Sequence, residues 1–179
     1  MILLRTIRLD ASDSFVFERA AAPGEWAVSG AFAFGWADPE KLRGKARSAF
    51  RAGFLGIKSL GRSTLVQTVE ASESGREAVV GMLAAQLLSH FAAPDHQTAR
   101  LAAEEEVDFA ASLGLHPAGA VIAVTRRHEN GVIRETFRNL QRREGVAHAR
   151  AFAFLEVDGE EDAPGEHVDL AALSKGADL

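Results

Sequence analysis

The chain has 179 residues, with 47% hydrophobic and 25% charged residues and a formal net charge of −5. This length suits a single globular domain with a substantial core. The absence of cysteine excludes disulfides, thiolate metal sites, iron–sulfur clusters and a cysteine nucleophile. Arg5 and Arg8 interrupt the N-terminal apolar run, and no stretch reaches the roughly 18 apolar residues of a membrane helix. We therefore expect a soluble, cytoplasmic protein.

Three strands are predicted at the N-terminus. Residues 2–9 and 15–21 are short runs rich in β-branched and aromatic side chains, and residues 25–36 alternate with a period of two. A polar cluster at residues 10–14 and a Pro-Gly pair at residues 23–24 supply the turns between them. This pattern predicts an antiparallel meander.

A basic segment, residues 41–62, is the most unusual feature of the sequence. It contains no acidic residue and seven cations, namely Lys41, Arg43, Lys45, Arg47, Arg51, Lys58 and Arg62. An acid and a proline at residues 38–39 predict the start of an amphipathic helix. Glycines at positions 53, 56 and 61 then predict a loop, which is followed by a strand at residues 64–70.

Two helices are predicted in the middle of the chain. Ser74, with a glutamate three residues later, has the spacing of a capping box at the start of the first helix. Pro94 ends that helix, and Asp95 or Thr98 can cap the second one, which stops at Gly114.

A β-hairpin is predicted around Asn130-Gly131, which lies between apolar-rich runs at residues 120–129 and 132–141. The two-residue turn fixes the register on one face, pairing Val124 with Phe137, Arg126 with Glu135 and His128 with Ile133. The opposite face carries three arginines, Arg127, Arg134 and Arg138. Residues 148–157 predict a last strand.

The order βββαβααβββ predicts an α+β fold with a largely antiparallel sheet and helices packed on one face. We expect residues 1–157 to form a single domain and residues 158–179 to form an acidic tail packed on it. The stretch 156–179 holds eight acids and one lysine. We therefore expect the basic segment to pair with the tail or with the three glutamates at residues 104–106.

Residues 56–63 have the spacing of a nucleotide phosphate loop, with Arg62 at the lysine position. That loop needs a strand before it and a helix after it, and here the predicted order is reversed. A simpler anion cradle could be built from Lys58, Arg62, Ser63 and backbone N–H groups. The alternative is a tight helix-to-strand crossing that only needs small residues.

The candidate ligand-binding residues form a hypothetical cationic recess suited to carboxylate or phosphate, made by Lys58, Arg62, Ser63, Arg127, Arg134 and Arg138. The plainer interpretation of arginines on a strand is solubility and protection of a sheet edge. No catalytic residue is assigned, because the sequence has no nucleophile motif and no dinucleotide fingerprint. The six histidines lack metal-ligand spacing, so we expect neither a metal nor a cofactor.

Composition also bears on the partners. The sequence pI of about 5.7 and the lack of aromatic residues among the cations argue against nucleic acid. The Ala- and Gly-rich apolar face of the basic helix argues against a membrane surface. The leading interpretation is a non-catalytic binding or accessory protein that contacts a protein partner or a small anion and forms a homodimer. The alternative is an enzyme acting on an anionic small molecule in the recess, with a Glu or His as acid and base.

Three groups of residues carry a family resemblance. They are RTIRLD with FVFERA and GEWAVSG in residues 5–30, GFLGIKSLGRST at 53–64, and AAEEEVDFAASLG with HPAG in 102–119. On these motifs the chain resembles a family of small uncharacterised alphaproteobacterial proteins over residues 2–157. The resemblance implies a bacterial cytosolic setting. It implies no activity, cofactor or site residue.

Overall fold

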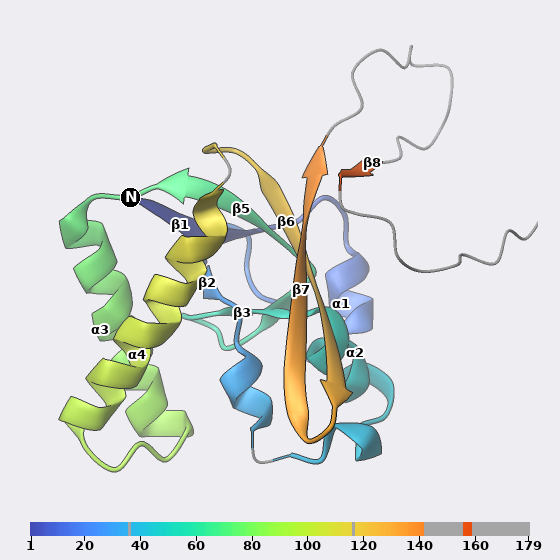
Figure 1. The fold of residues 1–179 in the computed structure, drawn as a ribbon, viewed down its shortest axis with the longest axis horizontal. Coiled ribbons are helices and arrows are strands. Elements are labelled where there is room, and N and C mark those ends of the chain that lie inside the picture. The colour runs from blue at the N-terminus through green and yellow to red at the C-terminus, as the bar shows by residue number, and fades with distance from the viewer. Residues whose placement is uncertain (36, 116, 142–155, 159–179) are drawn as a thin grey trace, which may run out of the picture.

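A computed structural model describes residues 1–35, 37–115, 117–141 and 156–158 of the chain (Figure 1). Most of the strand predicted at residues 148–157 lies outside these ranges. The predicted packing of the acidic tail beyond residue 158 also lies outside them.

An antiparallel sheet of eight strands forms the centre of the molecule, in the order β4-β3-β2-β1-β5-β6-β7-β8. Every pairing between neighbouring strands is antiparallel. The strands are β1 (Ile2–Ile7), β2 (Trp26–Val28), β3 (Phe54–Gly56), β4 (Arg62–Ser63), β5 (Leu65–Glu70), β6 (Val121–Glu129), β7 (Val132–Gln141) and β8 (Glu156–Asp158). The predicted α+β class and largely antiparallel sheet are confirmed.

The helices form two groups, with α3 and α4 side by side on one flank of the sheet and α1 and α2 near the other (Figure 1). The α-helices are α1 (Ser12–Val16), α2 (Gly44–Ala52), α3 (Glu73–His90) and α4 (His96–Ser112), and short 3-10 helices occupy Ala31–Phe34, Pro39–Lys41 and Leu113–Leu115. The main core packs the inward faces of α3 and α4 against the sheet, through residues such as Leu4, Val66, Leu83, Val107 and Ile122. The order of the elements is βαβαβββααβββ, so the predicted order was wrong in its first half.

The strand predicted at residues 15–21 does not form: the short helix α1 ends inside this range at Val16, and Ala20 makes an isolated parallel bridge to Arg62. Asp13, in the first turn of this helix, is only 5% exposed. Its carboxylate accepts hydrogen bonds from the backbone N–H of Thr64, at 3.2 and 3.3 Å, and from the Thr64 hydroxyl. This anchor to a residue 51 positions away overrides the local β propensity of the aromatic residues.

The strand predicted over residues 25–36 ends at Val28. Gly30 has a φ of 74°, in the left-handed region that breaks a strand. A Cβ on Gly30 would lie 2.5 Å from the Cβ of Leu55, so no side chain fits there. The chain then turns into the 3-10 helix Ala31–Phe34.

The basic segment also differs from its prediction. Asp38 caps a helical start as expected, with its side chain accepting a hydrogen bond from the N–H of Glu40, but only a 3-10 turn follows. The α-helix itself is shorter and covers Gly44–Ala52. The predicted glycine loop contains β3 and leads into β4, because β3 pairs with β2 on one side and β4 on the other. Pairing between distant strands, which local composition does not report, explains this difference.

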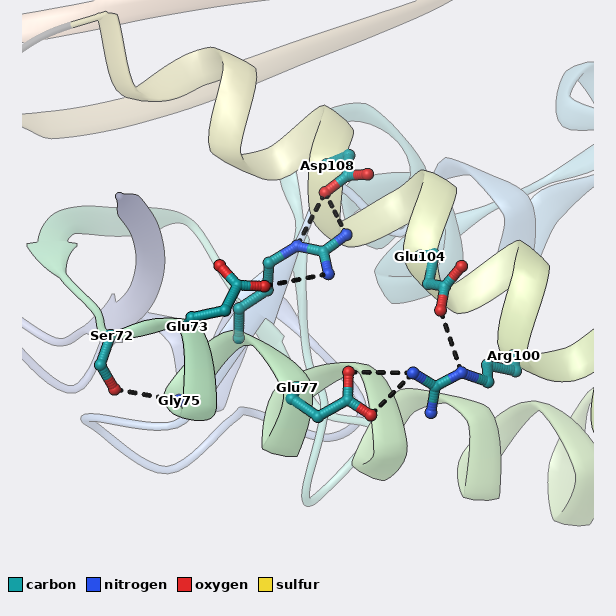
Figure 2. A network of polar contacts seen from close by, with 8 residues as sticks. Ser72, Glu73, Gly75, Glu77, Arg100, Glu104 and Asp108 are labelled. Carbon is teal, nitrogen blue, oxygen red and sulfur yellow. Dashed lines mark hydrogen bonds and ion pairs between the residues drawn. The ribbon is translucent and has the colours of Figure 1, made fainter.

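The second half of the chain follows its predictions more closely. The N-cap of α3 is Ser72, which accepts a hydrogen bond from the N–H of Gly75 at 3.1 Å, so the capping box predicted at Ser74 was wrong by two residues (Figure 2). Asp95 caps α4 through the N–H of Thr98 at 2.8 Å, as predicted. The hairpin register of β6 and β7 matches the prediction in all three pairs.

Candidate anion-binding site

The polar interior is centred on Arg126 of β6, which is 1% exposed. Its Nε lies 2.6 Å from Oε1 of Glu135, its partner on β7. Nη1 donates to the carbonyls of Phe50 at 3.1 Å and Gly53 at 2.9 Å, at the C-terminal end of α2. Nη2 donates to the carbonyl and to Oγ of Ser29, just after β2. Because each guanidinium nitrogen has a partner, Arg126 acts as a structural tie between α2, β2 and the hairpin.

Arg62 lies close to Arg126 but has no carboxylate partner among the residues that the structure describes. Its Nη1 donates to the carbonyls of Gly30 and Gly53, both at 3.3 Å. Its guanidinium carbon stands 4.6 Å from the centre of the Phe34 ring. Burial, with the positive charge of Arg126 adding to it, lowers the pKa of Arg62 to about 9. Among the described residues, only carbonyl dipoles and an aromatic ring therefore compensate this charge.

The side chain of Arg62 lies close to the backbone at the C-terminal end of α2. Arg62 is on β4, where it pairs with Leu55 of β3, and β3 is the strand that follows α2 directly. A Cβ on Gly53 would lie 3.1 Å from the Cβ of Arg62 and 2.9 Å from the carbonyl oxygen of Ala49. Glycine at this position lets the Arg62 side chain lie against the C-terminal turn of α2.

Arg62 lines a hollow of about 440 Å³ between α2 and the segment that follows α1. The charged residues around it are three cations, Arg19, Lys45 and Arg62, and one acid, Glu18. Its apolar wall includes Phe34 and Leu60. We call this space the Arg62 hollow. Its volume falls in the range of small-molecule sites, and its lining charges favour an anion.

The other predicted residues of this region lie elsewhere. Lys58 lines a second hollow, of about 540 Å³, together with Trp26, Ile57 and Met82. Ser63 is 1% exposed, and its Oγ donates to the carbonyls of Ile7 and Leu65, at 3.1 and 2.8 Å. Its hydroxyl is used inside the fold.

The three hairpin arginines, Arg127, Arg134 and Arg138, are exposed. Nε of Arg134 lies 3.2 Å from Oε2 of Glu129, and Nη2 of Arg138 donates to Oγ1 of Thr125. Successive residues of a strand point to opposite faces, so these arginines lie on the face of the hairpin opposite Arg126. The structure therefore separates the six predicted residues into four places: the Arg62 hollow, the hollow at Lys58, the interior at Ser63 and the outer face of the hairpin.

Sequence reasoning missed Arg19 and Lys45 as neighbours of Arg62. Lys45 was part of the recognised basic segment, and its place on α2 was the one available signal. Arg19 lay in a predicted strand, so nothing local connected it to the loop. In the structure Nη1 of Arg19 donates to the carbonyl of Ser59, at 3.2 Å, which brings the two segments together.

The expected pairing of the basic segment with the glutamates at residues 104–106 does not form. Glu104 instead lies 3.0 Å from Nε of Arg100, on α4 itself. Within the described ranges, the one ion pair of the basic segment joins Lys41 to Asp38, at 3.1 Å. The alternative pairing with the acidic tail lies outside the described residues.

Glu106 on α4 is a second titratable group whose pKa is strongly shifted. Burial, with the charge of Glu135 adding to it and Arg126 opposing it, raises the pKa of Glu106 to about 7. Glu106 lines neither the Arg62 hollow nor the hollow at Lys58. Its proton therefore belongs to the polar interior around Arg126.

Among the residues described by the structure, no group of three or more His, Asp or Glu side chains is placed to hold a metal ion. No helix in the same part of the chain is long and apolar enough to cross a membrane.

A search of curated proteins and a search of solved structures each found no match. A family model described as "Family of unknown function (DUF6505)" matches residues 1–157. This confirms the expected resemblance to a family without assigned activity. The matched region ends within β8 and includes every residue around the Arg62 hollow. The chain belongs to this family of unknown function.

Proposed function

We propose that the protein is a non-catalytic binding protein that takes up a small carboxylate- or phosphate-bearing ligand in the Arg62 hollow. One observation carries this proposal: Arg62 is mostly buried, has no carboxylate partner among the described residues and lines a hollow with two other cations. Buried charges in proteins are normally paired, because an unpaired charge away from water is costly. A bound anion would supply the missing partner.

The guanidinium of Arg62 still has N–H donors that could bind such a ligand. Only Nη1 makes hydrogen bonds with the described residues, so Nε and Nη2 keep their N–H groups. A planar fork of this kind binds carboxylate or phosphate through two parallel hydrogen bonds. Lys45 adds a flexible point charge at the same hollow, and Phe34 adds an apolar surface.

A purely structural role for Arg62 accounts for part of this arrangement. The carbonyl of Gly53 lies at the C-terminal end of α2, where the helix dipole is negative and stabilises a cation. The Phe34 ring adds a cation–π contact. These contacts explain how the ligand-free protein tolerates Arg62. They do not explain why Arg19 and Lys45 line the same hollow.

The proposal is tested by thermal unfolding of the full chain in increasing inorganic phosphate, pyrophosphate, acetate and citrate. A ligand that binds only the folded state adds about 2.7 kcal/mol of stability at 100 times its Kd. For a chain of this length we expect the midpoint to rise by roughly 5–10 °C at that concentration. Sodium chloride at the same ionic strength is the control. Equal midpoints in all four anions and in the chloride control would contradict the proposal.

Matched variants locate the binding. Arg62→Gln removes the fork and is expected to weaken phosphate binding at least tenfold, since a hydrogen bond to a charged group contributes about 1.5–3 kcal/mol. Lys45→Gln changes an exposed residue of the hollow, so it leaves the fold intact, and we expect a smaller loss. Arg47→Gln removes an exposed cation of the same helix that does not line the hollow. Equal losses in Lys45→Gln and Arg47→Gln would show unspecific attraction to the basic helix.

The second candidate function is an enzyme acting on an anionic small molecule, and the raised pKa of Glu106 favours it. A general acid or base works best when its pKa lies near the working pH. Glu106 lies outside the two hollows described above, which makes this the weaker candidate. In a turnover screen with phosphate and carboxylate esters, an enzyme of this kind would lose activity in Glu106→Gln and keep phosphate binding.

A further inference from the structure

The hollow at Lys58, of about 540 Å³, is a second place in the fold that is large enough for a small molecule. It shares no lining residue with the Arg62 hollow. Its walls come from the turn before β2, from the turn between β3 and β4, and from α3. The side chains that decide its chemistry are Glu25, Trp26, Ile57, Lys58 and Met82.

Glu25 brings a buried negative charge to this hollow, because it is only 9% exposed. Its Oε1 accepts a hydrogen bond from the N–H of Ala22, at 2.6 Å, and its Oε2 accepts one from the N–H of Ser59, at 2.9 Å. The carboxylate therefore joins the two turns that form the walls. Glu25 makes no ion pair with the residues that the structure describes. An unpaired buried charge is costly, so a cation is missing beside it.

A purely structural role explains the hydrogen bonds of Glu25 but not the missing cation. Two N–H groups need two acceptor oxygens, and a carboxylate supplies both where an amide supplies one. Each carboxylate oxygen has a second lone pair, which can accept from a ligand. A Cβ on Gly56 would lie 2.8 Å from Oε2 of Glu25, so the glycine leaves room for the carboxylate. An ammonium group of a ligand would provide the countercharge.

Lys58 provides the opposite charge at the same hollow. It is exposed, and it forms no ion pair within the described ranges. Its flexible four-carbon stem begins one residue before Ser59, whose N–H binds Glu25. Gln86 of α3 fixes this turn by donating to the carbonyls of Ile57, at 2.9 Å, and Lys58, at 3.2 Å. The hollow therefore contains an acid and a base that do not pair with each other.

The third feature of the hollow is its apolar wall, formed by Trp26, Ile57 and Met82. Met82 is 38% exposed, which is high for a side chain of this kind. The guanidinium carbon of Arg5 stands 3.9 Å from the centre of the Trp26 ring, so one face of the ring already has a cation. This wall favours an apolar group, and the recognition of positive charge is left to Glu25.

We propose that the hollow at Lys58 binds a small zwitterion of the α-amino-acid class with an apolar side chain. The ammonium of the ligand donates to the carboxylate of Glu25, its carboxylate accepts from Lys58, and its side chain packs on the apolar wall. A ligand with one charge would meet a like charge at Lys58 or at Glu25. This inference goes beyond the proposed function, because it concerns different residues and a different class of ligand.

Titration of the isotope-labelled full chain with L-phenylalanine, followed by NMR amide shifts, tests the inference. We expect shifts at Gly24 and Ser59, in the two turns of the hollow. Phenylpropionate lacks the ammonium of L-phenylalanine, and phenethylamine lacks its carboxylate. We expect each analogue to bind about tenfold more weakly, because one charged hydrogen bond is lost. The phenylpropionate comparison tests Glu25 without altering the fold. An analogue that binds as tightly as L-phenylalanine, or no binding of any of the three, would overturn the inference.

A pair of exposed lysines locates the binding and separates it from the proposed function. Lys58→Gln should weaken the binding of L-phenylalanine by about tenfold and leave that of phosphate unchanged. Lys45→Gln, in the Arg62 hollow, should show the reverse pattern. Equal losses of L-phenylalanine binding in both variants would mean unspecific attraction to the basic segment and would overturn the inference. Phosphate binding without L-phenylalanine binding would overturn it and leave the proposed function in place.

Discussion

Two regions of the molecule use their cations in opposite ways. Between α3 and α4, each arginine is held by acids of both helices. Arg100 lies 2.7 Å from Glu77 and 3.0 Å from Glu104. Figure 2 draws both contacts as dashed lines. Arg76 donates to Asp108 through two nitrogens, at 3.0 and 2.6 Å. The arginines on this side therefore form ion pairs that join the two helices.

The α2 side has more cations than the α3–α4 side and no comparable acids. Lys45, Arg47 and Arg51 are exposed and form no ion pair with the described residues. The sequence already contained this difference, because residues 41–62 include no acidic residue. A cation that has its partner in the fold stabilises the fold, whereas a cation without one remains available to a ligand or to another segment.

The largest expected effect on stability comes from replacing Arg126, the buried arginine that is paired inside the fold. Arg126→Met leaves the Glu135 carboxylate and the carbonyls of Phe50 and Gly53 without their donor in the interior. We expect a loss of about 3–5 kcal/mol in the free energy of unfolding, the usual cost of breaking a buried ion pair. Urea unfolding at pH 7 measures it.

Arg127→Met provides the matched control for that loss. Arg127 is the next residue on the same strand, is exposed and points to the other face. We expect a change within about 0.5 kcal/mol. Similar losses in both variants would mean that Arg126 is not the structural tie described above.

The next test concerns the carboxyl of Glu106, whose neighbour Glu135 is already engaged by Arg126. Its pKa is raised from 4.5 to about 7, so the folded state holds this proton more tightly than the unfolded chain does. The stabilising contribution of the proton is complete below pH 4.5 and is lost as the pH rises through 7. Ionised Glu106 then costs on the order of 1–3 kcal/mol.

Urea unfolding at pH 5 and pH 8 measures this contribution. The unmodified protein should lose stability between pH 5 and pH 8 as Glu106 ionises. In Glu106→Gln we expect this contribution to the loss to be absent. Glu105→Gln removes an exposed acid of the same helical turn and should have little effect. Parallel pH dependences of the unmodified protein and Glu106→Gln would contradict the assignment.

The parts of the fold that could be predicted are those with local causes. Asn130 and Gly131 both have positive φ, 53° and 79°, which is what a tight hairpin turn requires, and the turn then fixes every pair along β6 and β7. The cap of α4 at Asp95 depends on a contact three residues away. The α+β class follows from such elements added together.

The candidate site could be predicted only in part, because its causes are not local. Arg62 and Arg126 are 64 residues apart, and only the pairing of the strands and the packing of α2 bring them together. Arg19 reaches the same region through a hydrogen bond to the carbonyl of Ser59, which is 40 residues away and lies in the turn between β3 and β4. The basic segment correctly drew attention to Arg62. It could not show that Lys58, four residues earlier, lines a different hollow.

The smallest expected change in stability comes from comparing one arginine of the α3–α4 side with one arginine of α2. This comparison tests directly whether the two regions use their cations differently. Arg76→Met removes an ion pair that spans two helices, and Arg47→Met removes an exposed arginine of α2 that pairs with no described residue. We expect Arg76→Met to lower the free energy of unfolding by about 0.5–1 kcal/mol, and Arg47→Met to change it by less. Because the bridge to Asp108 is at the surface, the difference between the two variants should shrink in 1 M NaCl, which screens exposed charges.

The opposite ranking would break the contrast. If Arg47→Met were the more damaging change in the full chain, and the damage disappeared in 1 M NaCl, the α2 cations would be held by an ion pair to residues 159–179 that stabilises the fold. The α2 side would then resemble the α3–α4 side, with its acids supplied by the end of the chain in place of a neighbouring helix. Equal and negligible effects at both positions would instead mean that α3 and α4 are held together by their buried faces alone.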